Sequence, residues 1–226
     1  MLTVFFDIDQ TLWDFRTLMR RALARTIDEL LRRCPHTEGD LSVESFVADR
    51  QQVADELRGT GTSLEEVRLH AFRRSLQRLG ADSPGLAEQL NTHYFETRFD
   101  GVELFPDVLP TLETLSGRYR LGLLSNGNAI PDRLGLDRHV EAAVFAGEVG
   151  FEKPDRRIFE TAERTLPGDG YVMVGDSPLD DVAGAQAAGW AAVWLNREQA
   201  PPDPRVRPEW TATTLAEIPG WLDSLR

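Results

Sequence analysis

The stretch of sequence that decides the fold is LTVFFDIDQT, residues 2–11. Its apolar first half is typical of a buried strand in a parallel sheet. Asp7 and Asp9 follow, and because they lie two residues apart in extended chain they point the same way. Two carboxylates at one place repel each other unless one is protonated or a cation binds, so this strand end predicts an oxygen-rich site suited to Mg²⁺. A polar turn with Thr11 as a helix cap is the alternative.

Alternating strand and helix patterns follow in the second half of the chain. Short apolar runs predict strands over residues 121–124, 142–145, 171–174 and 191–195. Helical segments are expected over residues 108–115, 130–138, 154–165, 179–188 and 215–225. This order predicts an α/β fold with a three-layer Rossmann-like core, in which helices cover both faces of a parallel sheet.

Residues 15–98 break this alternation. Apolar residues recur there at helical spacing, as at Leu18, Ala22 and Ile27. Turn residues in the ranges 59–63 and 80–85 would separate four helices, and Ser63 with Glu66 fits a capping box. We therefore expect a helical cap over residues 15–98, inserted into a core formed by residues 1–14 and 99–226.

Composition narrows the possible functions. The 226 residues carry a formal net charge of −12, which argues against binding to nucleic acid or to an anionic membrane. Cys34 is the only cysteine, so an internal disulfide is impossible. The first residues carry no pattern of a targeting segment, and a cytoplasmic protein is expected. Oligomeric state cannot be read from these features.

Polar residues also follow three later strands. Ligands of parallel sheets bind beyond the carboxyl ends of the strands, so these positions are candidate site residues. They are Ser125, Asn126, Lys153, Asp176, Asp180 and Asp181. Each also fits an ordinary turn or helix cap when taken alone. Chemically suitable residues at four strand ends together favour one shared site.

Lys153 is unusual in this composition. It is the only lysine among 25 basic residues. A compact ammonium group suits a crowded phosphate site better than the wide guanidinium of arginine. The alternative is a solvated charge before a helix that begins at Pro154.

Four ordered motifs carry a resemblance to a known family. They are residues 7–11 (DIDQT), 124–127 (LSNG), 152–155 (EKPD) and 175–181 (GDSPLDD). With these motifs, nearly the whole chain resembles the haloacid dehalogenase superfamily in its phosphatase branch. The insertion resembles the helical cap of that family's first cap class.

The resemblance implies a role for each motif residue. It makes Asp7 the nucleophile that forms an aspartyl-phosphate, and Asp9 the general acid and base. The Asp7 and Asp176 carboxylates and the Asp9 main-chain carbonyl would hold Mg²⁺, and Ser125, Asn126 and Lys153 would bind the phosphoryl group. Thr11, Asp180 and Asp181 would support the site. Spacing favours Asp181 for orienting Lys153 and Asp180 for the outer metal shell.

Alternative functions stay open at this stage. A phosphomutase would keep all four motifs, whereas a 2-haloacid dehalogenase would lack the acid at Asp9. A non-catalytic phosphate-binding protein is the third alternative. The capped layout suits a small phosphorylated metabolite or nucleotide as substrate. Candidate substrate contacts are Trp13, Asp14, Arg20, Arg21, Arg50 and Arg68, each of which also fits packing or a solvated helix face.

Overall fold

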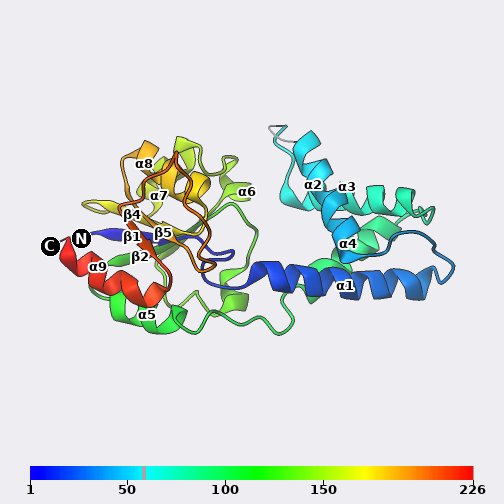
Figure 1. The fold of residues 1–226 in the computed structure, drawn as a ribbon, viewed down its shortest axis with the longest axis horizontal. Coiled ribbons are helices and arrows are strands. Elements are labelled where there is room, and N and C mark those ends of the chain that lie inside the picture. Colours follow the sequence, from blue (N-terminus) through cyan, green and yellow to red (C-terminus); the bar gives the residue numbers. More distant parts are fainter. Residues whose placement is uncertain (58–59, 226) are drawn as a thin grey trace. The chain divides into compact units, whose positions relative to one another are not determined.

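The computed structural model describes residues 1–57 and 60–225 (Figure 1). The chain divides into two compact units, one made of Met1–Asp14 with Glu103–Arg226 and one of Phe15–Val102. The helical unit thus ends at Val102, four positions beyond the end expected at residue 98. Every helix of the described residues is too short or too polar to span a membrane.

The first unit is built on one six-stranded parallel sheet in the order β3-β2-β1-β4-β5-β6. Its strands are β1 (Thr3–Phe6), β2 (Arg120–Ser125), β3 (Ala142–Phe145), β4 (Tyr171–Gly175), β5 (Ala191–Leu195) and β6 (Trp210–Ala212). Later strands extend the sheet on both sides of β1, so the strand order reverses at that strand. The end of β1, where Asp7 follows, is therefore the switch point at which α/β folds bind ligands.

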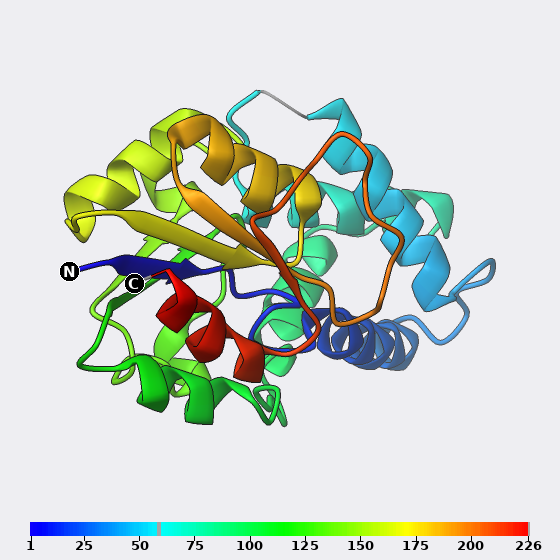
Figure 2. The same ribbon diagram turned by 60° about the vertical axis from the view of Figure 1, so that its left-hand side comes forward.

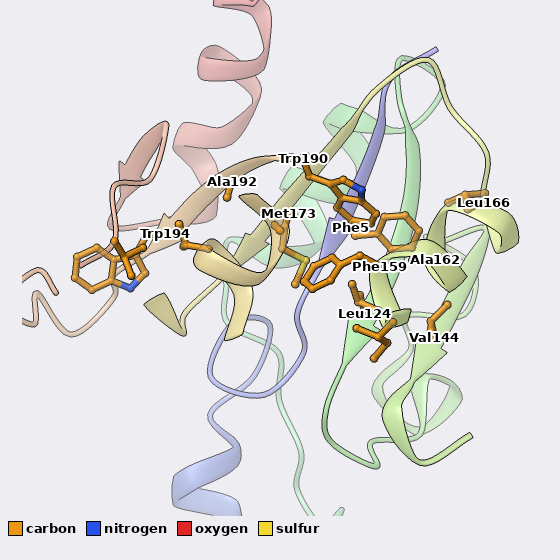
Figure 3. Packing of buried hydrophobic residues seen from close by; sticks show 14 residues of the cluster. Phe5, Leu124, Val144, Phe159, Ala162, Leu166, Met173, Trp190, Ala192 and Trp194 are labelled. Carbon is orange, nitrogen blue, oxygen red and sulfur yellow. The ribbon is translucent and has the colours of Figure 1, made fainter. Parts of the chain in front are cut away.

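Helices cover both faces of the sheet. Helices α7 (Arg156–Thr165) and α8 (Gly184–Ala188) lie on one face, and α5 (Val108–Leu115) and α9 (Ile218–Ser224) lie on the other (Figures 1 and 2). Under α7 the Trp190 ring stacks on Phe5, with ring centroids 5.3 Å apart, and meets Phe159 edge-on at 5.2 Å (Figure 3). These layers confirm the predicted three-layer Rossmann-like fold.

Several predicted elements differ from the structure. Residues 130–138 form only a 3₁₀ turn, η1 (Pro131–Leu134), because Gly135 turns into the left-handed region and ends it. Helix α7 begins at Arg156 and not at Pro154, since the Asp155 carboxylate caps it by accepting the Arg157 N–H. The segment over 179–188 starts as a π-helical turn, η2 (Pro178–Ala183), before α8. The sequence reading missed β6 and the four-residue helix α6 (Ala146–Val149), which are too short to show a period.

The second unit contains the four predicted helices in its described residues. They are α1 (Phe15–Arg33), α2 (Val43–Glu56), α3 (Leu64–Arg78) and α4 (Leu86–Thr97). The capping box of Ser63 and Glu66 at the start of α3 is confirmed. Leu18, Ala22 and Ile27 are buried on one face of α1, as their spacing predicted. Gly59, in the predicted turn before α3, lies outside the described residues.

Candidate active site

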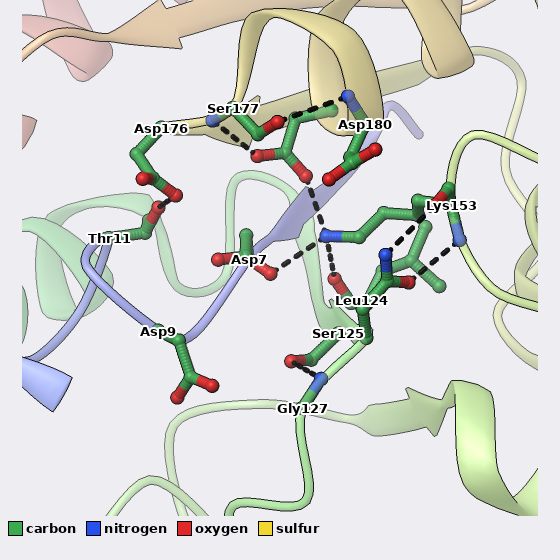
Figure 4. Close-up of polar contacts among 12 residues, drawn as sticks. Asp7, Asp9, Thr11, Leu124, Ser125, Gly127, Lys153, Asp176, Ser177 and Asp180 are labelled. Atoms are coloured by element: carbon green, nitrogen blue, oxygen red, sulfur yellow. Dashed lines mark hydrogen bonds and ion pairs between the residues drawn. The ribbon is translucent and has the colours of Figure 1, made fainter. Parts of the chain in front are cut away.

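Lys153 lies at the centre of the polar residues beyond the sheet. Its ammonium group donates to Asp7 Oδ1 at 2.7 Å, to the Leu124 carbonyl at 2.8 Å and to Asp181 Oδ1 at 2.6 Å (Figure 4). These contacts use all three donors of an ammonium group. Only 2% of the side chain is exposed, so the charge is held by protein oxygens and not by water. The structure thus joins segments 146 and 28 residues apart in the chain.

Burial and charge act in opposite directions on this ion pair. Burial raises the pKa of the Asp7 carboxyl; Lys153 opposes this effect, and the neighbouring Asp181 and Asp176 add to it. Burial alone would lower the pKa of Lys153, but the charges of Asp181 and Asp7 outweigh it and raise that pKa. The charges thus favour the ammonium form of Lys153, and burial with the neighbouring acids disfavours the ionised form of Asp7.

A cluster of carboxylates surrounds this pair. One oxygen each from Asp7, Asp176 and Asp181 lies within 4.8 Å of the others, the only such group of three among the described residues. Burial, followed by the charge of Asp181, raises the pKa of Asp176 to about 7. A cation at this place would stabilise the ionised forms, and oxygen donors are what Mg²⁺ prefers. The residues present therefore fit a magnesium site.

The two oxygens of Asp181 already have partners. Oδ1 accepts from Lys153, and Oδ2 accepts the Ser177 N–H at 2.9 Å. Asp181 thus makes the contact with Lys153 that spacing favoured. Asp180 lies outside the cluster of three; burial and the charge of Asp181 raise the pKa of its carboxyl. Its own N–H donates to Ser177 Oγ at 3.1 Å, at the start of η2.

Asp9 is held by a contact that the sequence reading did not anticipate. The Trp13 indole N–H donates to Asp9 Oδ1 at 2.7 Å. Trp13 is fully buried, in agreement with the packing alternative for this residue. Gln10 takes a positive φ of 62° and its N–H donates to the Trp13 carbonyl at 3.0 Å, so a tight turn brings Trp13 back to Asp9.

Two glycines allow the carboxylates to approach the neighbouring backbone. A Cβ atom on Gly127 would lie 2.5 Å from Asp9 Oδ2, and one on Gly175 would lie 2.2 Å from Asp181 Cγ. Any larger residue at these positions would displace the carboxylates. Gly127 and Gly175 belong to the motifs named above, but the sequence does not show which carboxylates approach them.

Ser125, Asn126 and Thr11 hold the surrounding loops. Ser125 is 1% exposed, and its hydroxyl accepts the Gly127 N–H at 3.0 Å. The Asn126 side chain accepts the Lys153 N–H at 2.7 Å and donates to the Lys153 carbonyl at 2.9 Å. Asn126 therefore contacts the main chain of Lys153, and its expected contact with a phosphoryl group stays a prediction. The Thr11 hydroxyl lies 3.5 Å from Asp176 Oδ1.

Comparisons with known proteins agree with this geometry. The family model of haloacid dehalogenase-like hydrolases matches residues 1–189. A glyceraldehyde 3-phosphate phosphatase of Methanopyrus kandleri is 32% identical over 203 residues, covering 86% of this chain and 83% of that protein. An N-acylneuraminate-9-phosphatase of Mus musculus is 31% identical over 237 aligned positions, which cover 98% of this chain and 94% of that phosphatase.

A solved structure is similar over the full length. It is a 2-haloacid dehalogenase from Pseudomonas syringae pv. Tomato DC3000, with a TM-score of 0.82, 32% identity and 100% coverage of both chains. The parallel sheet, its switch-point carboxylates and the inserted helices define a hydrolase with a Rossmann-like core and a helical insertion. The chain belongs to the haloacid dehalogenase-like hydrolase family.

Proposed function

We propose that this hydrolase is a Mg²⁺-dependent phosphatase that acts on small phosphate monoesters. The observation that carries the proposal is the contact of Asp7 Oδ1 with Lys153 Nζ at 2.7 Å inside the carboxylate cluster. A buried carboxylate held by a cation at a strand end can attack an electrophile, and a dianionic phosphate ester needs the positive charge that Lys153 and a metal would provide. The two phosphatase-named relatives support this proposal.

The proposed reaction has two steps. In the first, the Asp7 carboxylate attacks phosphorus, the bond from phosphorus to the ester oxygen breaks, and Asp9 gives its proton to the leaving alkoxide. In the second, Asp9 takes a proton from water, which attacks the aspartyl-phosphate. Inorganic phosphate leaves and Asp7 returns as a carboxylate. Both steps need Asp9 at one fixed position, and the Trp13 indole N–H holds its carboxylate there.

Charge and donors are arranged for the phosphoryl group. We assign Ser125 and Lys153 to binding of its oxygens, for which Lys153 would exchange one of its three present contacts, and Asn126 to fixing the main chain of Lys153. We assign Asp7, Asp176 and the main-chain carbonyl of Asp9 to Mg²⁺, which would supply positive charge against the phosphate oxygens. Asp181 keeps Lys153 in place, and we leave Asp180 in the outer shell.

A 2-haloacid dehalogenase is the second candidate function. The similar solved structure named as such a dehalogenase favours it. Asp9 argues for the phosphatase, because a leaving alkoxide needs a proton whereas a halide ion does not. A phosphomutase would use the same residues but would transfer phosphate without releasing it. We propose a sugar phosphate or similar small metabolite, or a nucleotide, as substrate, and the cytoplasm as the location.

Phosphate release from a panel of phosphorylated metabolites tests the proposal. Wild type is assayed with Mg²⁺ and with EDTA, beside Asp7→Asn and the control Asp137→Asn, an exposed carboxylate in the same unit. We expect release only by wild type and the control, and only with Mg²⁺. Release that persists in Asp7→Asn would overturn the assignment of the nucleophile. Chloride release from 2-chloropropionate without phosphate release would favour the dehalogenase.

A further inference from the structure

Three arginines converge on one tyrosine inside the helical unit. Arg68 on α3 is 8% exposed, and Arg98, directly after α4, is 3% exposed. Arg50 on α2 is exposed. Burial raises the pKa of the Tyr94 hydroxyl, and the charges of Arg98, Arg68 and Arg50 oppose this effect. Arginines are seldom buried, so Arg68 differs from the solvated helix face that the sequence allowed for it, whereas the exposed Arg50 agrees with that alternative.

Arg68 is held by neutral groups. Its Nε–H donates to Asn91 Oδ1 at 2.5 Å, and its guanidinium carbon lies 5.5 Å from the Tyr94 ring centroid and 5.1 Å from that of Phe95. Among the described residues it forms no ion pair with a carboxylate. Burial, and after it the charge of Arg98, lowers the pKa of Arg68 to about 10. The structure thus bears an unfavourable buried charge that an anion would stabilise.

The carboxylate nearest to this region along α2 is already neutralised. Asp49 is buried, and its Oδ2 accepts from the Ser75 hydroxyl at 2.7 Å and from Arg78 Nη2 at 2.9 Å. This network satisfies Asp49 and leaves Arg68 to other partners. Glu65, three positions before Arg68 on the same helix, acts on it by charge but forms no ion pair with it, so an oxyanion from outside the chain would supply the paired contact that a guanidinium favours.

A pocket of the helical unit contains this positive charge. Its polar lining is Arg50, Arg68, Ser75 and Tyr94. Its apolar lining is Met19, Leu23, Phe46, Ala71 and Phe72. The pocket is narrow, which suits the end group of a ligand better than a whole metabolite. Apolar walls around a few charged donors are typical of sites for small organic ions.

We propose that this pocket binds the carboxylate end group of a small organic acid, with Arg68 and Arg50 as its donors, and leaves the carbon skeleton outside the pocket. The planar guanidinium of Arg68 can hold a carboxylate through two parallel hydrogen bonds. All lining residues belong to the helical unit, so the proposal does not depend on the proposed phosphatase activity. Nothing in the four catalytic motifs accounts for these arginines.

Titration calorimetry on the full chain tests the site with benzoate as the probe and inorganic phosphate as a second ligand. The proteins are wild type, Arg68→Gln, Arg50→Gln and Arg73→Gln. Arg73 is the matched control, since it lies on the same helix as Arg68 but is exposed and pairs with Glu88. We expect benzoate to bind wild type and Arg73→Gln alike, and the Kd to rise about tenfold or more in the other two variants. Phosphate binding that is equally sensitive to both variants would widen the site to oxyanions in general and would support it.

Other outcomes would overturn the site. Equal benzoate affinity in all four proteins would do so. Benzoate binding that is lost in Ser125→Ala but kept in Arg50→Gln would also overturn the site, because the ligand would then lie in the catalytic unit. Failure of benzoate to bind would exclude a carboxylate site. If circular dichroism shows that Arg68→Gln does not fold, two other measurements test the site. They are the benzoate affinity of Arg50→Gln and the shift of the Arg68 Nε–Hε NMR signal of the wild type on addition of benzoate.

Discussion

Replacement of Lys153 by methionine tests the centre of the active site. The substitution keeps most of the side-chain volume but removes the charge and all three donors. Asp7 and Asp181 would then face each other without the ammonium that lies 2.7 and 2.6 Å from them. The side chains are 10% and 2% exposed, so water can replace little of the lost contact.

We expect Lys153→Met to lower the free energy of unfolding by ~3–5 kcal/mol at neutral pH, the usual cost of removing one partner of a buried ion pair. Asp181→Asn in the same chain removes one of the two facing carboxylates. The double variant should therefore be more stable than the sum of the single effects predicts, by at least ~1 kcal/mol. The Lys153→Met protein should also release no phosphate.

Urea unfolding in EDTA, followed by tryptophan fluorescence, measures these differences. Arg156→Met is the control because Arg156 is exposed and pairs with Glu160 on the surface of α7, where an ion pair contributes at most ~1 kcal/mol. A Lys153→Met effect no larger than the control's would refute the reasoning, as would strict additivity with Asp181→Asn. Either result would mean that water, and not Lys153, compensates the buried carboxylates.

Three further substitutions probe stability and the position of Asp9. Burial would raise the pKa of Asp107, but its hydrogen bonds with Arg197, Thr214 and the Leu215 N–H outweigh burial and lower that pKa. The ionised Asp107 carboxylate therefore stabilises the fold at neutral pH. This contribution is lost as the pH falls from the ordinary pKa of 3.8 through the lowered pKa of the folded state. Asp107→Asn should cost ~2 kcal/mol in urea unfolding at neutral pH, and its difference from wild type should vanish in acid. Trp13→Phe removes the donor to Asp9 and part of a fully buried ring, so it should lower kcat about tenfold and alter its pH profile, with KM little changed; an unchanged profile would contradict this role. Gly127→Ala should reduce phosphate release by at least ~10²-fold with normal circular dichroism, since its Cβ displaces Asp9.

The fold could be predicted wherever local patterns and tertiary packing agree. The apolar runs at β3 and β5 and the helix α5 lie at the predicted residues, because buried strands and an amphipathic helix leave a direct mark on the sequence. The helix predicted over residues 130–138 was wrong because Pro131 and Gly135 allow only a single 3₁₀ turn between them. The start of α7 was wrong because an Asp155 cap outweighs the preference of proline for a first turn.

The active site shows a similar limit. Strand ends and residue types were enough to predict that Asp7, Lys153, Asp176 and Asp181 approach one another, because parallel strands bring their carboxyl ends to one edge. The contact of Trp13 with Asp9 could not be predicted, since it depends on the left-handed conformation of Gln10. Such a conformation in a residue other than glycine leaves no regular pattern in a sequence.

The single lysine of the chain connects composition to mechanism. Its ammonium group meets three oxygens at 2.6 to 2.8 Å, and only 2% of the side chain is exposed. A planar guanidinium has no arrangement of donors that would reach a carbonyl and two carboxylates around one point. Arg68 shows the converse case, because its guanidinium carbon lies 5.1 and 5.5 Å from two aromatic centroids and its Nε–H donates to Asn91. The chain therefore uses lysine where a cation must contact several oxygens around one point and arginine where a cation lies over aromatic rings. Replacing Lys153 with arginine would disrupt the site even though the charge is kept.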